Sequence, residues 1–327
     1  MSVVNSIIRA VLFGITADVL IKCGLISTRY FRRNKGSTDY ATIPDVTLAG
    51  DFVIEGSFLT SNSGSAGTFV GGTTISTAEV LLDILTDGKV RFVVYSSSGS
   101  FAGLIQSAVG FNDGRLHTFK ATMNGKSAEL FVDGVSVGTG NYSSYDFVNT
   151  SRLCVRSNNT NPFNGILANL KIYDNGTLVR DYPINDNSNT IRDLANGQDG
   201  TIINGNADDW GLFDKQANGD WLGQELASTR DVSFTLGAAY EWGDLSTPST
   251  IVQTGRRYSI EYKVAETPSG ESGIRNRSFD DVEPYIYPIS SYSRQGAAAR
   301  DTANIQGNMA GAYLLNEVSV KEVLKSA

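Results

Sequence analysis

The chain has 327 residues, of which 19% are charged and 41% hydrophobic, with a formal net charge of −7 and an isoelectric point near 4.9. This length exceeds one ordinary sandwich and suits two domains. The acidic balance argues against nucleic-acid binding, because such surfaces are basic, and the 34 glycines favour short strands with tight turns over a helical bundle.

The first 36 residues form a basic segment ahead of an acidic body. Residues 1–35 hold six basic residues and one acid, which leaves 21 basic and 33 acidic residues in the rest. A short amphipathic helix is predicted, because apolar residues recur at intervals of four, three and four at Val4, Ile8, Val11 and Ile15. We expect this stripe to pack against sister chains or a partner, or against the chain's own sandwich.

A polar, basic linker is predicted from residue 29 to residue 37. Its cations belong either to an anchor that docks on an acidic partner surface or to a basic tail without a partner, and they include Arg29, Arg32 and Arg33. The apolar run over residues 10–26 is interrupted by Asp18 and Lys22 and is too short for a membrane helix. No signal-peptide cleavage site follows it, so we expect neither insertion nor secretion by such a peptide.

Two hairpins are predicted in the next part of the chain, where apolar and polar residues alternate. The first joins strands over 80–85 and 90–95 through a turn at 86–88. The second joins strands over 117–122 and 128–132, and Asp133-Gly134 then turns into a further strand. Short strands at near-regular spacing indicate a β-sandwich.

A second, smaller unit is predicted from the strands that follow Trp221. These strands are expected over 233–236, 258–264, 285–287, 312–315 and 318–320. The two cysteines, Cys23 and Cys154, fall in different predicted domains, so we expect no disulfide framework and synthesis in a reducing cytoplasm.

Three elements of the first sandwich resemble the laminin-G / concanavalin A-like family, in the family's order. Gly114-Arg-Leu-His117 resembles its Gly-x-Trp-His segment with Leu116 in place of Trp, and Leu130-Phe-Val-Asp-Gly134 resembles its strand that ends in Asp-Gly. Phe163-Asn-Gly-Ile166 with Lys171-Ile-Tyr-Asp174 resembles its closing strand. The resemblance implies an all-β fold: a laminin-G-like jelly-roll sandwich (37–215) and a second smaller, carbohydrate-binding-module-like β-sandwich (216–327), after a short N-terminal amphipathic helix in an anchoring and oligomerisation segment (1–36).

The order of these parts also resembles bacteriophage virion proteins of the tail or head. Residues 316–323 are similar to the closing strand of carbohydrate-binding-module-like domains on phage fibres. This resemblance implies a non-enzymatic virion-surface protein, made in the host cytoplasm, that attaches to other virion proteins through its N-terminus. It further implies a homo-oligomer, with a trimer favoured, that adheres to host-surface glycan. The alternatives are a purely structural capsid or tail decoration protein, and a polysaccharide-degrading enzyme.

Few residues suit catalysis. Glycosidases of the same superfamily place acids at alternate strand positions, whereas Glu79, Asp83 and Asp87 are spaced by four, with Leu81 between the first two. His117 is the sole histidine and matches a structural position of the family, and the chain has no Gly-x-Ser-x-Gly elbow. We therefore expect no enzyme activity and no transition-metal site.

Sugar binding needs an exposed aromatic face and planar polar side chains. In the first domain the candidates are Tyr142, Tyr145, Asn158, Asn159 and Asn161, and in the second they are Trp242, Tyr285, Tyr287 and Tyr292. Aromatic residues that alternate along a strand also form cores, so both roles stay open here. No organic cofactor is expected, and the one candidate metal is calcium at Asp146, because laminin-G-like domains often hold calcium on a rim loop.

Overall fold

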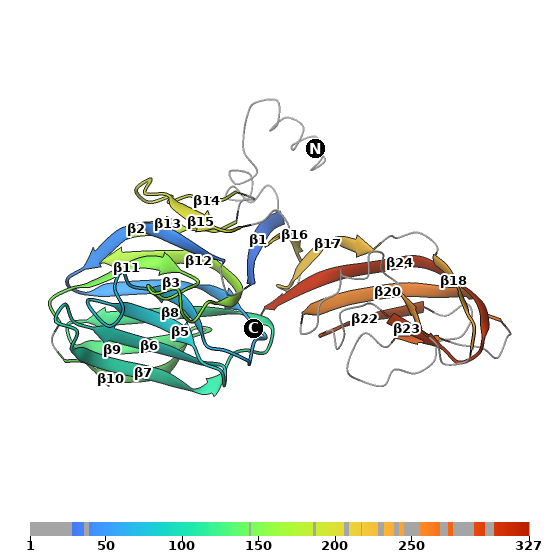
Figure 1. Cartoon of the computed structure of the whole chain (residues 1–327), viewed down its shortest axis with the longest axis horizontal. Helices are drawn as coiled ribbons and strands as arrows, with labels where there is room; N and C mark the ends of the chain where they lie inside the picture. Colours follow the sequence, from blue (N-terminus) through green and yellow to red (C-terminus); the bar gives the residue numbers. More distant parts are fainter. Residues whose placement is uncertain are drawn as a thin grey trace, which may run out of the picture. The chain divides into compact units, whose positions relative to one another are not determined.

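The computed structural model describes residues 28–35, 39–143, 145–185, 188–205, 209–216, 218–227, 232–238, 242–244, 256–268, 274–276, 291–297 and 304–326. The chain forms two compact units that divide between Phe213 and Asp214. Every named element in the described residues is a β-strand, which confirms the all-β class (Figure 1). The predicted helix with Val4, Ile8, Val11 and Ile15 lies outside the described residues.

The first unit is a sandwich of two sheets. The strands of sheet I are β1 (Thr28–Lys35), β3 (Phe52–Leu59), β8 (Arg115–Asn124), β9 (Ser127–Val132), β10 (Val135–Asn141), β12 (Asn164–Asp174) and β13 (Thr177–Tyr182). Their order is β10-β9-β8-β3-β12-β1, and β13 also pairs with β12.

Sheet II forms the other layer of this sandwich. Its strands are β2 (Tyr40–Leu48), β4 (Gly67–Gly71), β5 (Val80–Ile84), β6 (Lys89–Tyr95), β7 (Phe101–Gly110), β11 (Val148–Leu153), β14 (Thr190–Ile191) and β15 (Gly200–Ile203). Their order is β14-β15-β2-β11-β4-β5-β6-β7.

Aromatic side chains from the facing sheets meet in the core. The Phe69 ring on β4 lies 4.7 Å from the Phe58 ring on β3 and 5.3 Å from the Phe119 ring on β8, centroid to centroid. All three are at most 2% exposed. Burying a side chain of this size contributes about 1.5–3 kcal/mol, so these contacts hold the two sheets together.

Both predicted hairpins are confirmed by the strand register. Leu82 on β5 lies opposite Phe92 on β6, and Ala121 on β8 lies opposite Leu130 on β9. Asp133 and Gly134 form the turn from β9 to β10 with φ of 51° and 74°. Two successive residues with positive φ make a type I′ turn, whose twist matches that of antiparallel strands.

The basic segment over 28–35 differs from the predicted linker, because it forms β1. Its backbone pairs with β12, with Arg33 opposite Ile166. Arg32 is 2% exposed, and its guanidinium bonds to Asn34 and Asp39 and reaches the Asp209 Oδ2 at 3.5 Å. A buried cation requires such partners, so Arg32 holds its own domain together and the predicted docking role is wrong for this residue. Only the backbone of Arg29 and Arg33 is described.

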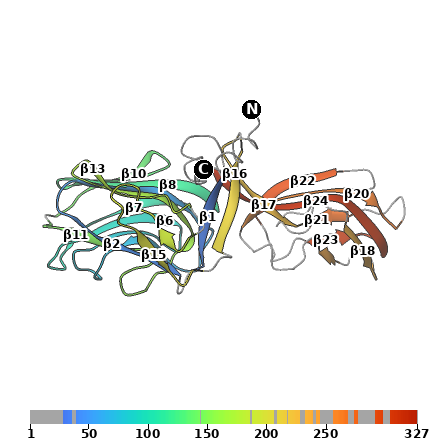
Figure 2. The same cartoon turned by 90° about the horizontal axis from the view of Figure 1, so that it is seen from above.

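The second unit follows β16 (Trp210–Lys215), which spans the division. Its strands are β17 (Trp221–Ala227), β18 (Val232–Leu236), β19 (Trp242–Asp244), β20 (Arg257–Glu266), β21 (Ile274–Asn276), β22 (Ser291–Ala297), β23 (Asn304–Gly307) and β24 (Gly311–Ser326). The long strand β24 pairs with β17, β18 and β20, and β20 pairs in turn with β22 (Figures 1 and 2). The strands β19, β23 and β21 form a separate small sheet.

Candidate functional site

The outer face of sheet I carries a regular array of polar and aromatic side chains. Along β8 and β9 the residues that enter the core alternate with residues that do not, and Ala121, Leu130 and Val132 are all at most 2% exposed. Because successive side chains of a strand point to opposite faces, the residues between them lie on the outer face.

One row of this face crosses five strands with directly opposed residues. From β12 to β10 the row consists of Lys171, Glu55, Lys120, Phe131 and Ser136. Lys120 is exposed, and Phe131 and Glu55 are half-buried. Phe131 therefore offers part of its ring to solvent between charged and hydroxyl side chains. We call this set the charged row.

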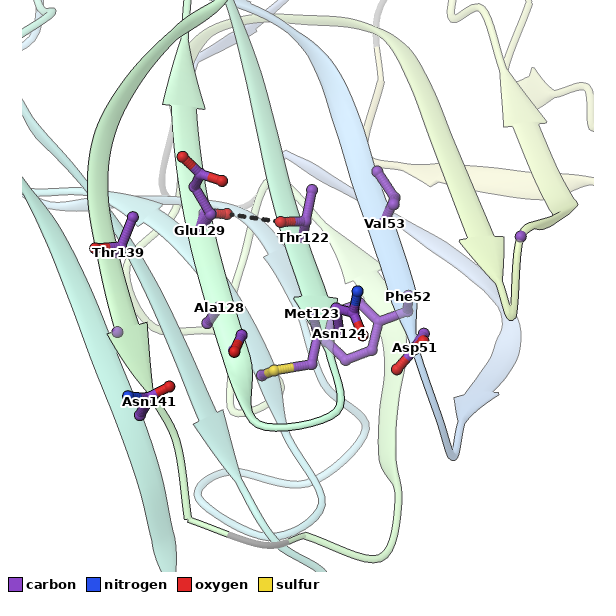
Figure 3. Close-up of a pocket in the computed structure, with 13 residues that line it drawn as sticks. Asp51, Phe52, Val53, Thr122, Met123, Asn124, Ala128, Glu129, Thr139 and Asn141 are labelled. Atoms are coloured by element: carbon purple, nitrogen blue, oxygen red, sulfur yellow. Dashed lines mark hydrogen bonds between the residues drawn. The ribbon is translucent and has the colours of Figure 1, made fainter.

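A second row lies one step along the same strands. It consists of Tyr173, Val53, Thr122, Glu129 and Thr139. Figure 3 shows Thr139, Glu129, Thr122 and Val53 side by side, with the Thr122 hydroxyl donating to the Glu129 backbone oxygen at 3.4 Å. Neighbouring strands are about 4.8 Å apart, so each row presents closely spaced donors and acceptors.

Two hollows open on this face. One, of about 470 Å³, includes Glu55, Ser57, Thr118, Lys120, Phe131, Asn169 and Lys171 in its lining. Asn169 has φ of 53° and lies where the register between β12 and β3 shifts. A bulge of this kind re-aims a side chain, and the Asn169 amide lies 3.5 Å from the Ser57 hydroxyl at the hollow's edge.

The other hollow, of about 710 Å³, is acidic and rich in amides. Its polar lining includes Asp51, Thr122, Asn124, Ser127, Glu129, Thr139 and Asn141 (Figure 3). The Asp51 carboxylate accepts a hydrogen bond from the Gly125 backbone N–H at 2.6 Å, which fixes it beside the β8–β9 turn. Carboxylates and amides together can bind several hydroxyl groups at once.

The charges of the first hollow are incompletely compensated. Within the described residues, neither the Lys120 nor the Lys171 ammonium group forms a hydrogen bond or ion pair, although both residues lie opposite Glu55. Glu55 instead accepts a hydrogen bond from the Tyr173 hydroxyl at 3.4 Å. Burial and the Glu55 charge raise the pKa of Tyr173, so its hydroxyl stays protonated and able to donate.

This face was not predicted from the sequence. The alternation of side chains along a strand could have revealed this face. Once Leu130 and Val132 are assigned to the core, Phe131 must lie on the opposite face. The outward position of Phe131 was missed because all three residues of the run 130–132 are of types that are commonly buried.

The predicted aromatic candidates of the first domain are less available than a stacking surface requires. Tyr142 is 3% exposed, belongs to the core and donates its hydroxyl to the Phe92 backbone oxygen at 2.8 Å. This corrects its predicted role, because no open ring face is left. Tyr145 is half-buried, contacts the Phe52 ring edge-on and donates its hydroxyl to the Gly50 oxygen at 2.8 Å.

The predicted amides lie in the loop between β11 and β12. Asn158 and Asn159 are exposed and Asn161 is half-buried. The Asn158 side chain accepts hydrogen bonds from Thr160, and Asn159 and Asn161 have φ of 59° and 49°. These residues shape their own loop, and their role in binding stays a prediction.

Asp146 is exposed, and its carboxylate is already engaged. Ser97 donates to it through both the backbone N–H, at 3.2 Å, and the hydroxyl. Within the described residues, no three acidic, histidine or cysteine side chains converge as a metal site would require. Calcium also takes amide and backbone oxygens as ligands, so a calcium ion at Asp146 stays a prediction.

In the second unit only one predicted aromatic side chain is described. Tyr292 is 8% exposed and stacks on Tyr262, with ring centroids 4.9 Å apart and planes 20° apart, so it belongs to the core. This corrects its predicted role as an exposed platform. Only the backbone of Trp242 is described, and Tyr285 and Tyr287 lie outside the described residues.

His117 is held between two carboxylates. Its Nδ1 lies 2.7 Å from Asp133 Oδ2 and its Nε2 lies 2.9 Å from Asp113 Oδ1. Its ring packs near Phe58 and Phe111, and it is 5% exposed. With both nitrogens bonded, the imidazole links the turn after β9 to the loop before β8, and neither nitrogen is left to activate a nucleophile.

The two acids nearest to a glycosidase pattern are fully buried in ion pairs. The Arg156 guanidinium donates two hydrogen bonds, of 2.9 and 2.6 Å, to the Glu79 carboxylate. The Arg91 guanidinium likewise donates two, of 2.9 and 2.5 Å, to the Asp83 carboxylate. Both carboxylates are 0% exposed. Burial raises the pKa of Asp83, while the bond from Arg91 opposes this. In this arrangement neither acid is open to a sugar.

Comparison with known families agrees with the fold. Residues 35–179 match the family model Laminin_G_3, described as the concanavalin A-like lectin/glucanases superfamily. This match and the two-sheet sandwich together support a concanavalin A-like jelly-roll fold for this segment. A comparison with curated proteins gives no match. No helix in the described part of the chain is long and apolar enough to span a membrane.

Solved structures give distant similarities. A candidate carbohydrate-binding protein from Bacteroides ovatus is 13% identical with a TM-score of 0.43, covering 57% of this chain and 59% of that one, which is less than two thirds of its length. A heptameric SAP-like pentraxin from Limulus polyphemus is 9% identical with a TM-score of 0.36 (54% and 94% covered). The carbohydrate-binding module CBM66 from Bacillus subtilis is 12% identical with a TM-score of 0.33 (43% and 86% covered). Similarity at this level is too distant to carry a function to this chain.

Proposed function

We propose that the outer face of sheet I binds glycans and that the protein acts as an adhesion module without catalysis. The observation that carries this proposal is the charged row, in which the Phe131 ring lies between Lys120 and Ser136 on adjacent strands. Sugars are recognised by an aromatic surface for their C–H faces together with polar groups for their hydroxyls. The match of residues 35–179 to a superfamily of lectins and glucanases supports the same class of ligand.

The buried ion pairs favour binding over hydrolysis. A glycosidase uses two carboxyl groups that reach the scissile bond, whereas Glu79 and Asp83 are enclosed by arginines. Among the described acids, Asp51, Glu55 and Glu129 line the open hollows, where hydrogen bonding to hydroxyl groups requires no proton transfer.

The biological setting that we propose is the surface of a bacteriophage particle, on the tail or head. The support for it is the sequence resemblance, with a basic N-terminus ahead of two β units. Several copies on one particle would convert a weak affinity for host glycan into firm attachment by avidity.

The binding proposal is tested with the full-length protein on an array of bacterial surface polysaccharides, followed by calorimetry on each positive glycan. We expect saturable binding without release of reducing ends. A blank array, together with no retention on any host polysaccharide, would overturn the proposal and favour a purely structural decoration role. Release of reducing ends would favour an enzyme.

The setting is tested separately, by immunogold labelling of particles from lysates that contain this protein. Label on intact particles that is lost when residues 1–27 are deleted, a truncation that keeps β1 and the buried Arg32, would support attachment through the N-terminus. Particles that retain the truncated protein would contradict the anchor, and the absence of label from every particle would contradict the virion setting.

A further inference from the structure

The hollow around Phe131 differs in charge from the rest of the molecule. The whole chain carries a formal charge of −7, yet the ionisable residues that line this hollow are two lysines and one glutamate. The neighbouring hollow is lined by Asp51 and Glu129. A local excess of positive charge on an acidic protein favours a ligand with negative charge at that point.

The positions of the two lysines indicate where the negative group of the ligand would lie. Lys171 on β12 and Lys120 on β8 are both opposite Glu55 on β3, so the two lysines flank the middle strand. Two strand spacings separate them, roughly 10 Å between their backbones, and their flexible side chains can converge over the hollow. Since neither ammonium group has a hydrogen bond or ion pair among the described residues, both retain donors for a ligand.

From these observations we infer that the glycan bound on this face is acidic, with a carboxylate, sulfate or phosphate group between Lys120 and Lys171 and a sugar ring against Phe131. This inference deepens the proposed function and rests on it. Attraction of the whole protein to polyanions would not produce such binding, because its net charge is negative. We therefore assign the selectivity to the local pair of lysines, and the lysine variants below distinguish it from attraction to the basic residues of the segment 1–35.

The experiment compares each acidic oligosaccharide with its own neutral form. The probes are uronic-acid trimers and their carboxyl-reduced counterparts, and sulfated and phosphorylated trimers with their desulfated and dephosphorylated forms, titrated into the full-length protein by calorimetry. We expect binding of at least one acidic member, about tenfold weaker or absent in its neutral form, and the member that binds identifies the anionic group. Higher salt should weaken the binding, because the contact is electrostatic and close to solvent.

The variants are Lys120→Gln and Lys171→Gln, and the matched control is Lys89→Gln, which removes the same charge from β6 in sheet II. We expect a fivefold to tenfold loss for each of the first two and no change for the control. Glu55→Gln should strengthen binding, because it removes the negative charge between the lysines. A merely structural role of the lysines would not produce that opposite response.

The possible results distinguish a failure of the acidic-glycan inference from a failure of glycan binding itself. Equal binding of the acidic and neutral forms, equal loss in Lys89→Gln, or a loss in Glu55→Gln as large as in the lysine variants would overturn the acidic-glycan inference and leave glycan binding intact. No binding of any trimer, combined with a blank polysaccharide array, would overturn the proposed function and this inference with it. Circular dichroism and melting of each variant establish that the fold is retained.

Discussion

Glu79 and Arg156 are 77 positions apart in the sequence and form a two-pronged ion pair, with bonds of 2.9 and 2.6 Å. The carboxylate is fully buried and the arginine side chain is 15% exposed. The pair joins the beginning of β5 to the loop after β11, and Arg156 also donates to the Ser76 hydroxyl at 3.3 Å. It therefore fixes two segments of sheet II that are close only in the folded state.

Glu79→Gln should destabilise the first unit by about 3 kcal/mol, because it leaves a mostly buried guanidinium without its counter-charge. For a domain of this size that corresponds to a fall in melting temperature of roughly 10 °C, measured by calorimetry. Asp87→Asn is the control, since the Asp87–Lys89 pair is exposed, and it should leave the melting temperature unchanged. A Glu79→Gln protein that melts with the control would contradict this account.

Stability should depend on pH through Asp113. Burial opposes its ionisation, but the hydrogen bond from His117 and the backbone N–H of Arg115 outweigh this and hold the pKa of Asp113 below its ordinary value of 3.8. A lowered folded pKa means that the contribution is complete above 3.8 and is lost as the pH falls through the folded value. The gap in urea midpoint between wild type and Asp113→Asn should therefore have its full size well above pH 3.8 and close in strong acid. A gap that widens toward acid pH would have the wrong sign.

Phe131→Ala should weaken glycan binding about fivefold to tenfold, because a stacked ring contributes on the order of 1 kcal/mol beyond its buried area. Phe101→Ala is the matched control: it removes the same side chain from an exposed position, 54% accessible, on β7 of sheet II. Calorimetry on a glycan that binds the wild type distinguishes them. Equal losses in both variants would remove sheet I as the binding face.

Gly134→Ala should lower the free energy of unfolding by about 1 kcal/mol, through backbone strain alone. Gly134 has φ of 74°, and no atom lies within 4 Å of the place where a β-carbon would be added. Gly64→Ala is the comparison, because Gly64 has an ordinary φ and its nearest atom would be 3.5 Å away. Chemical unfolding should show a loss for the first and none for the second. The reverse order would mean that the β9–β10 turn is not of type I′.

The sequence predicted correctly those strands in which the local order of apolar and polar residues matches the order of buried and exposed side chains. In the hairpin of β5 and β6, apolar residues enter the core on both strands and a Gly-containing turn joins them. Asp133-Gly134 is likewise a turn, whereas Asn164-Gly165 lies within β12 although Asn-Gly also favours a turn. The difference is tertiary, because Asn164 and Gly165 pair with Lys35 and Asn34 of β1 and so belong to the sheet.

The parts that could not be predicted depend on distant partners. Arg32 looks like a solvated cation, and only the folded chain brings Asp39 and Asp209 to it. Tyr142 looks like a loop aromatic, and its burial follows from the position of Phe92 on another strand. The binding face likewise depends on the register of five strands, which no single segment contains.

The register of the charged row also sets a minimum length for its ligand. Five adjacent strands span about 19 Å from the first backbone to the last. A monosaccharide would contact only two or three of the five residues, whereas an oligomer laid across the strands would contact Lys171 at one end and Ser136 at the other. Affinity should therefore climb with the number of sugar units until the row is filled, and longer polymers should gain nothing more per site.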